Sequence, residues 1–289
     1  MKRLQFFLKV LLFLGIAACM AWAMDWPPHY WSHLAADPSR AAAYYEKGLS
    51  CQKGGSTAEA LRWFRQAADL GHAAAQAKMG TAYATGTGLP EDPKEALRWW
   101  RKAAAQGQAE GQYGLALAQL SGALIPQDEE AGVKSLQQAA SQDFAPAQHR
   151  LAECYLHGDG VTEDPAEAVR WYRRAAENGH ADAQVALGFI CKRGLWGAAQ
   201  DAAQAAQWFL KAAAQKDARA QYQLGMCCAN GTGVPKDLVE AMKWHLLASS
   251  TLGNDATQWI EAHEKDLTSG QNAEARARAQ AFRSQQQKK

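Results

Sequence analysis

The sequence predicts an all-α protein, an α/α solenoid of about six helix-turn-helix repeats closed by a C-terminal capping helix. Internal periods of 20–50 residues are typical of such solenoids, and two markers recur here at that interval. One is a glutamine that returns every 36 or 37 residues, at Gln76, Gln112, Gln148, Gln184, Gln221 and Gln258. The other is an aromatic pair, at Trp63-Phe64, Trp99-Trp100, Trp171-Tyr172 and Trp208-Phe209, with Trp244-His245 as its last copy.

Composition agrees with a helical globular protein. The chain has 289 residues, 48 % hydrophobic and 21 % charged, with abundant alanine, the residue of highest helix propensity. The formal net charge is only +2, so nothing attracts the chain generally to nucleic acid. The basic residues near the end are interpreted as a solvated helix face and tail; they are Arg276, Arg278, Arg283, Lys288 and Lys289.

Residues 1–23 are typical of an export signal. Lys2, Arg3 and Lys9 precede an apolar run, and small residues around Ala23 fit cleavage after that residue. Two alternatives stay open: lipidation of Cys19, or retention of residues 4–23 as a membrane anchor. We therefore expect a bacterial periplasmic or secreted protein, or a membrane-anchored protein that faces the periplasm. The mature chain itself is not expected to insert into the membrane.

Residues 24–40 are predicted to cap the first repeat. Trp26, Tyr30 and Trp31 supply apolar surface for this purpose. His29 and His33 are four residues apart and could share a metal ion in a helix, but two ligands are too few for a structural zinc site. The segment is therefore interpreted as packing, and no metal is expected.

Residues 41–252 form the six predicted repeats, each with two helices. In the first helix of a repeat, large residues four apart share one face, as Met79 and Tyr83 do. In the second helix, Ala96, Trp100 and Ala103 form one stripe. The third repeat keeps the spacing but has Ser135-Leu136 in place of the aromatic pair.

The recurring Gly-x-Gly stretches are predicted to build turns rather than nucleotide sites. Gly86 follows the first helix, where a left-handed C-cap is needed, and Asp92 and Pro93 suit the N-cap and first position of the second helix. A dinucleotide fingerprint requires a third glycine and a preceding strand. The same turn recurs at Gly158 and Gly231.

These motifs together resemble the Sel-one-like repeat (SLR) family, which is related to tetratricopeptide repeats. The clearest matches are "GTAYATGTGLPEDPKEALRWWRKAAAQG", "LAECYLHGDGVTEDPAEAVRWYRRAAENG" and "LGMCCANGTGVPKDLVEAMKW". The first turn is shortened ("KGGSTAEAL"), the third repeat lacks Gly-x-Gly, and the fifth turn is one residue longer. The resemblance implies a right-handed solenoid that acts as an adaptor in protein complexes.

Residues 253–289 are predicted to hold C-terminal capping helices and a basic tail. Residues 255–267 have the pattern of a further first helix, and residues 269–285 that of a polar closing helix. A solenoid requires such a cap, because its last hydrophobic face would otherwise meet water.

Five cysteines remain in the mature chain: Cys51, Cys154, Cys191, Cys227 and Cys228. Three of them occupy equivalent positions of different repeats, about 8–10 Å apart by helix-packing distances, which is too far for a disulfide. Buried free thiols and a single disulfide both stay open. The SLR family has a secreted branch with a cysteine pair in each repeat, and these cysteines do not follow that arrangement.

One motif suggests an alternative function. Ser50-Cys51-Gln52-Lys53 matches S-x-x-K, the nucleophile motif of penicillin-binding enzymes, and the cysteine-rich SLR branch is associated with β-lactam binding. A hydrolase of β-lactams or cell-wall peptides is therefore the alternative, although no K-T-G or S-D-N partner motif exists in the chain. We expect no enzyme, no catalytic residues and no cofactor.

The predicted functional surface is the stripe on the other face of the first helices, away from the large residues that pack in the core; this stripe lines the concave face in tetratricopeptide-type solenoids. A protein or peptide partner would lie in this groove; the other interpretation is that curvature buries the stripe between neighbouring first helices. The predicted partner-binding residues are Tyr113, Leu117, Leu120, His149, Glu153, Val185, Phe189, Lys192, Tyr222 and Met226.

Overall fold

The computed structural model describes residues 38–287, which form fourteen α-helices and one 3-10 turn without a strand. Six helix pairs follow one another, so the predicted helical solenoid is confirmed. The first helices of the pairs are α3 (Pro38–Lys53), α5 (Ala73–Thr85), α7 (Ala109–Ser121), α9 (Ala145–His157), α11 (Ala181–Arg193) and α13 (Ala218–Asn230). The second helices are α4 (Thr57–Asp69), α6 (Pro93–Ala105), α8 (Glu129–Ala140), α10 (Pro165–Glu177), α12 (Ala202–Ala214) and α14 (Leu238–Leu252).

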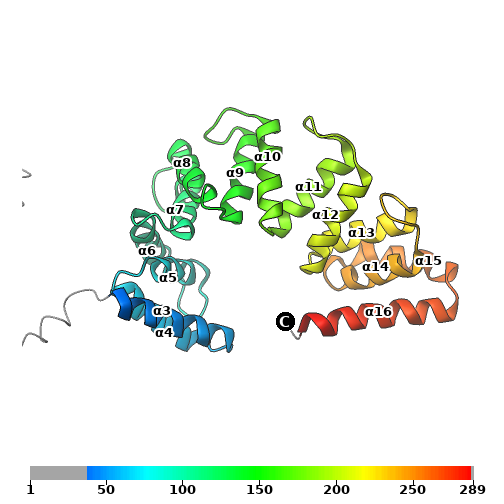
Figure 1. Ribbon diagram of the computed structural model, residues 1–289, viewed down its shortest axis with the longest axis horizontal. Helices are drawn as coiled ribbons and strands as arrows, with labels where there is room; N and C mark the ends of the chain where they lie inside the picture. Colours follow the sequence, from blue (N-terminus) through cyan, green and yellow to red (C-terminus); the bar gives the residue numbers. More distant parts are fainter. Residues whose placement is uncertain (1–37, 288–289) are drawn as a thin grey trace, which may run out of the picture.

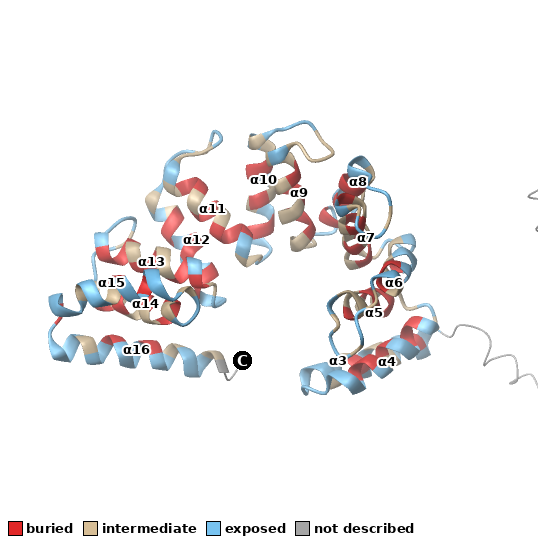
Figure 2. Ribbon diagram, turned by 180° about the vertical axis from the view of Figure 1, so that it is seen from behind, coloured by how far each residue is buried: buried red, intermediate tan, exposed pale blue. Residues whose placement is uncertain are grey.

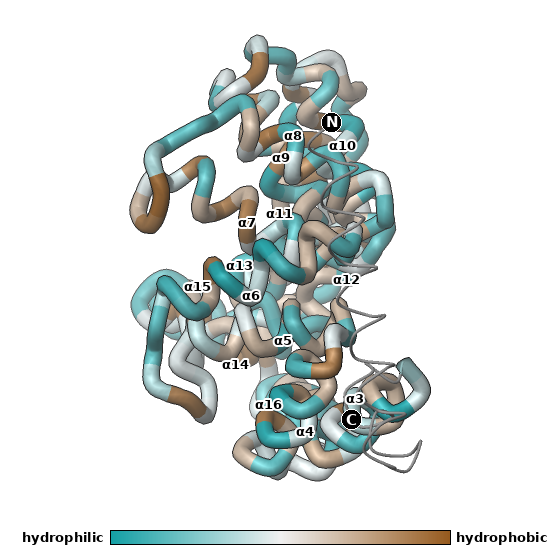
Figure 3. The backbone as a smooth tube through the Cα atoms, turned by 90° about the vertical axis from the view of Figure 1, so that its left-hand side faces the viewer, coloured by the Kyte–Doolittle hydropathy of each residue, from teal (hydrophilic) through white to brown (hydrophobic). Residues whose placement is uncertain are grey.

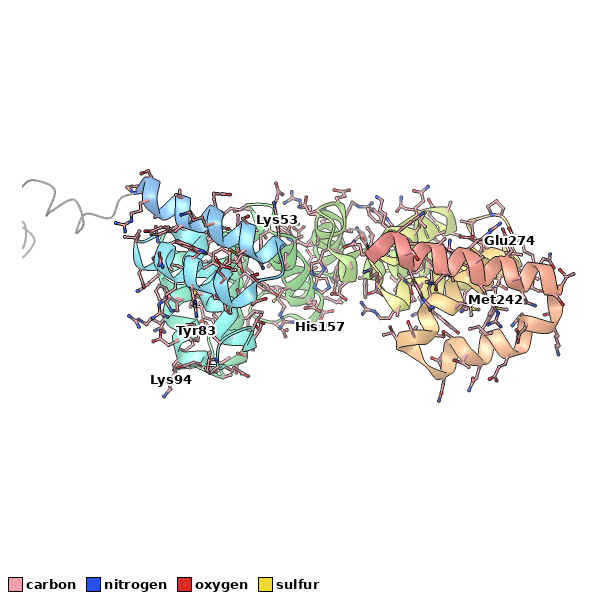
Figure 4. All side chains as sticks on the ribbon, turned by 90° about the horizontal axis from the view of Figure 1, so that it is seen from below. Lys53, Tyr83, Lys94, His157, Met242 and Glu274 are labelled. Carbon is pink, nitrogen blue, oxygen red and sulfur yellow. The ribbon has the colours of Figure 1, made fainter. Side chains whose placement is uncertain are left out.

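The pairs stack into an open arch, with α5 and α7 on its inner side relative to α6 and α8 (Figure 1). Buried residues lie along the facing sides of the helices throughout the arch (Figure 2). The hydrophobic core therefore runs along the whole arch instead of forming a single compact cluster. The chain continues after α14 with α15 (Asn254–His263), η1 (Glu264–Asp266) and α16 (Ser269–Gln287). The C-terminal ends of α3 and α16 point toward each other across the opening of the arch (Figures 1 and 4).

The predicted turn chemistry is confirmed at the helix ends. Asp92 accepts hydrogen bonds from the backbone N–H groups of Lys94 and Glu95, and Pro93 occupies the first turn. Gly86 ends α5 in the left-handed conformation, with φ of 65°. Sequence and local structure therefore agree at these helix ends, whereas the residues before α4 and α9, Ser56 and Phe144, make no side-chain cap hydrogen bond.

The second glycine of each Gly-x-Gly serves a purpose that the sequence did not indicate. A Cβ on Gly233 would lie 2.0 Å from the Ala202 carbonyl oxygen, and one on Gly160 would lie 2.4 Å from the Glu129 carbonyl oxygen. Both contacts are to the beginning of the second helix in the preceding repeat. This glycine therefore allows two repeats to approach each other, in addition to turning the chain.

A glycine in most first helices makes room for the ring of the second helix. A Cβ on Gly188 would lie 2.5 Å from the ring of Phe209, and one on Gly225 would lie 2.7 Å from the ring of His245. Phe209 and His245 are fully buried. The second member of the aromatic pair is thus the residue that joins the two helices of a repeat, and histidine takes this place in the last repeat.

Five of the six recurring glutamines are buried and form a ladder along the solenoid, whereas the sixth, Gln258, is exposed; the five are Gln76, Gln112, Gln148, Gln184 and Gln221. The side-chain amide of Gln184 donates to the Ala176 carbonyl at 3.0 Å, at the end of the preceding second helix. Its Oε1 accepts a hydrogen bond of 2.9 Å from Gln215, which caps the second helix of the same repeat. In the same manner, the side-chain amide of Gln148 donates to the Ala140 carbonyl, and its Oε1 accepts a hydrogen bond from Asn178. In these two repeats the buried carboxamide therefore joins three helix ends, with both its N–H group and its oxygen hydrogen-bonded.

Candidate functional site

The predicted stripe lies on four consecutive first helices, α7, α9, α11 and α13. Leu120 and Val185 are buried, with 7 % and 4 % of their surface exposed. The other eight residues are half-buried, and they are Tyr113, Leu117, His149, Glu153, Phe189, Lys192, Tyr222 and Met226. The stripe is thus neither a free surface nor a sealed interface between helices.

Each aromatic residue of the stripe rests against a ring from another element. Phe189 meets the ring of Phe209 edge-on at 5.3 Å between centroids, and Tyr222 meets His245 in the same way at 5.1 Å. Tyr113 lies 5.5 Å from Phe144, and its burial raises the pKa of its hydroxyl. These rings are fixed in position by the core and present only part of their surface.

The polar residues of the stripe already have partners within the chain. Glu153 accepts a hydrogen bond of 3.0 Å from Arg150, and Lys192 donates to Gln223 on the next first helix at 2.9 Å. His149 stacks on His180 with 4.6 Å between ring centroids. Burial lowers the pKa of His149, which favours its neutral form. A partner would therefore meet groups already held in position.

Neighbouring first helices touch each other directly beside the stripe. Glu110 on α7 accepts hydrogen bonds from Lys78 and Thr81 on α5, at 2.9 and 2.8 Å. Arg219 on α13 forms an ion pair with Asp182 on α11. These contacts close much of the surface between first helices, which accounts for the partial burial of the stripe.

One part of the stripe opens into an apolar hollow of about 320 Å³. Leu117 and Leu120 line it together with Trp100, Leu124 and Arg150, which come from α6, the turn after α7, and α9. Leu124 is one of few large apolar residues with more than a third of its surface exposed in the described chain. The spacing of the repeats did not indicate this hollow, although the turn of the third repeat differs from the others: it lacks Gly-x-Gly and contains the apolar stretch "ALIPQ".

The remaining candidate groups show no assembled chemistry. Ser50 and Lys53 are both exposed on the last turns of α3, where Lys53 points away from the helix (Figure 4). The five cysteines Cys51, Cys154, Cys191, Cys227 and Cys228 are free thiols. Burial raises the pKa of Cys154 and Cys228 to about 11, which disfavours the reactive thiolate. Within residues 38–287 no three metal-ligating side chains are grouped to hold an ion.

The predictions for the N-terminal segment lie outside the described residues, and so do His29, His33 and Cys19. Hydrophilic and hydrophobic residues are mixed along the described helices (Figure 3). None of these helices is sufficiently long and apolar to cross a bilayer.

A family model described as the Sel1 repeat matches most of the chain. The matched residues are 32–53, 39–72, 73–108, 109–144, 145–180, 181–217 and 218–250. The last five matches coincide with the helix pairs that begin at α5, α7, α9, α11 and α13. A search of curated proteins finds no match.

Solved structures support the same assignment of fold. A protective antigen of uropathogenic Escherichia coli with an SLR fold is 29 % identical over 85 % of this chain, with a TM-score of 0.64. The chain spans only 54 % of that antigen. A Sel1 repeat protein from Oxalobacter formigenes is 27 % identical, with 83 % of this chain and 96 % of that one covered and a TM-score of 0.61. An immunity protein from Pseudomonas aeruginosa, 20 % identical over 74 % of this chain and 82 % of its own, shares the fold with a TM-score of 0.51.

Proposed function

Because this chain belongs to the Sel1 repeat family, whose members are generally protein-interaction scaffolds, we propose that it is an exported, non-enzymatic scaffold that binds a protein or peptide along its first helices. The stripe from Tyr113 to Met226 supports the proposal, since it presents aromatic and apolar side chains held in fixed positions. Side chains that are already ordered lose little conformational entropy on binding.

The observation that carries the proposal is the hollow around Leu117. It is concave and lined mainly by Trp100 and leucine side chains, and Arg150 at its border is already paired with Glu153. Pockets with these properties are typical of sites for an apolar anchor side chain of a partner. Buried aromatic and leucine surface gives an anchor about 25 cal/mol for each Å² removed from water. An apolar side chain of a peptide fits this chemistry.

Export forms a separate part of the proposal and has its own test. When the full chain is produced in a Gram-negative bacterium, we expect the mature N-terminus at Met24 in the periplasmic fraction, measured by intact-mass spectrometry. If the measured mass instead corresponds to a chain that begins at Cys19 and carries fatty acyl groups, the N-terminus is lipidated and not cleaved after Ala23. Full-length chain in the cytosol would contradict export altogether.

The hollow is tested by position-specific crosslinking in the producing cell. A photoreactive residue at Leu124, beside the hollow, is expected to crosslink a discrete partner. The matched control carries the same residue at Leu210, which is 49 % exposed on α12, a second helix that holds no residue of the stripe. The partner is expected from the first position and not from the second.

The substitution Leu117→Glu is expected to abolish this crosslink, because it places a charge in the hollow. Leu117 is half-buried and lies on a helix, so the substitution costs about 1 kcal/mol of stability and the chain remains folded. Leu210→Glu is the control, because it introduces the same charge away from the hollow and is expected to leave the crosslink intact. A crosslinked partner that persists in Leu117→Glu, or that both positions capture equally, would show that the hollow does not bind it.

A further inference from the structure

The glutamine ladder ends at Gln221 with one bond unmade. In the four preceding repeats, the buried glutamine accepts a hydrogen bond of 2.8–2.9 Å from an amide at the end of the second helix; the donors are Gln106, Gln142, Asn178 and Gln215. Gln221 keeps the donor side of this pattern, to the Ala213 carbonyl at 3.3 Å. Position 251, thirty residues further on, holds threonine, and no group among residues 38–287 donates to Gln221 Oε1.

The unpaired oxygen borders a pocket of about 300 Å³ at the ends of α13, α14 and α16. Gln221 is 4 % exposed, so its carboxamide is buried except toward this space. Leu247 and Phe282 supply apolar walls. Gln286 also lines the pocket, but its side-chain amide donates to the Ala214 carbonyl at 3.1 Å instead of to Gln221. The Gln221 oxygen is not among the fully enclosed polar atoms of residues 38–287 that lack a partner, so solvent reaches it and an N–H donor that enters the pocket replaces a solvent contact.

Two cations border the same pocket. Arg283 donates to the Leu246 carbonyl at 2.8 Å, and Lys216 lies 3.5 Å from the Gln286 carbonyl. Neither has a carboxylate within ion-pair distance in the described part of the chain, whereas other basic residues of α16, Arg276 and Arg278, are paired with glutamates. The pocket therefore combines an acceptor that requires an N–H donor with positive charge that favours a carboxylate.

We propose that this pocket binds a partner peptide in which a glutamine or asparagine is followed by an acidic residue. The carboxamide N–H of the peptide donates to Gln221 Oε1, as Gln215 donates to Gln184 in the preceding repeat. The side-chain methylenes lie between Leu247 and Phe282, and the carboxylate is held by Lys216 and Arg283. None of the ten stripe residues lines this pocket, so the inference stands apart from the proposed function.

The test uses the full chain and two small peptides, acetyl-Gln-Glu and acetyl-Glu-Glu, each with a free C-terminal carboxylate. Binding is measured by titration with side-chain amide NMR signals as the readout. The glutamine peptide is expected to bind at least about tenfold more tightly, because the glutamate peptide places an acceptor against the Gln221 oxygen. Charge alone predicts the opposite order, since the glutamate peptide carries one more negative charge.

Two substitutions assign the effect to individual residues. Gln221→Met preserves side-chain length and removes the acceptor, so the tenfold preference is expected to disappear. Gln184→Met is the matched control, because it removes the same ladder bond inside the solenoid and is expected to leave the preference intact. Arg283→Met on the exposed face of α16 is expected to weaken both peptides and to retain their ratio.

Equal binding of the two peptides, or no binding of either at millimolar concentration, would overturn the inference. The same holds if Gln184→Met removes the preference as fully as Gln221→Met does, since the effect would then come from loosening of the ladder. If Gln221→Met does not fold, two other results decide the question. The unmodified chain must bind the glutamine peptide more tightly than the glutamate peptide, and Arg283→Met must weaken both peptides equally.

Discussion

Alanine in place of Gly233 is expected to lower the free energy of unfolding by about 3 kcal/mol, one of the two largest effects that we predict. Gly233 has φ of 76°, where a residue with a Cβ is strained by about 1 kcal/mol. The added Cβ would also lie 2.0 Å from the Ala202 carbonyl oxygen of the preceding repeat. Backbone cannot move aside as a flexible side chain does, so overpacking adds about 2 kcal/mol.

Gly179→Ala separates the two contributions. Gly179 also has a positive φ, 87°, but no atom lies within 4 Å of the position that a Cβ would occupy. This variant is therefore expected to lose only about 1 kcal/mol. Urea unfolding followed by circular dichroism compares both variants with the unmodified chain. Equal losses would mean that the contact between repeats at Gly233 contributes nothing to stability.

The second large effect is a loss of stability on acidification through His245. This imidazole is fully buried, and neither ring nitrogen has a hydrogen-bond partner within the described chain. It lies between Tyr222 and Trp259, with Trp259 stacked on His263 in turn. Burial, and then the nearby His263, lower the pKa of His245 to about 4.

The direction of this effect follows from proton uptake. Below pH 6.5 the unfolded chain binds a proton at His245 that the folded chain does not bind until about pH 4. Stability is therefore complete above pH 6.5 and decreases as the pH falls toward 4, by about 3 kcal/mol in total for this residue. Unfolding free energies at several pH values between 7 and 4 measure the slope.

His245→Phe is the matched variant, because phenylalanine occupies the equivalent place at Phe64 and Phe209. We expect its stability to change less between pH 6.5 and 4, by the part that His245 supplies. Some slope remains, since burial also lowers the pKa of His72, His149 and His180. An unchanged slope in His245→Phe would contradict the assignment.

The spacing of the sequence predicted the helix pairs, their caps and their turns. It did so because these features depend on residues close in the chain, such as Gly86 with Asp92. The bonds of the ladder were not predicted, although Gln76 marked the register. Its partner Gln106 lies thirty residues further on, and periodicity does not show which polar side chain reaches a buried carbonyl.

The candidate stripe was predicted by position, but the exposure of its members was not. Leu117 and Leu120 are three residues apart on α7, and only Leu117 keeps a half-exposed side chain. Leu120 is buried because it packs against Gly132 on α8, the second helix of the same repeat, and periodicity does not show which side chain meets that glycine. The hollow likewise depends on three helices from different repeats, so no local pattern announces it.

The open arch has a mechanical consequence. Because each repeat touches mainly its neighbours, the helix pairs are elastic elements connected in series, and their compliances add. A small rotation in the same sense at every junction therefore produces a large change in the distance between the ends of α3 and α16. A pulling force on the two ends acts equally on every junction, and the resulting extension is shared among all of them.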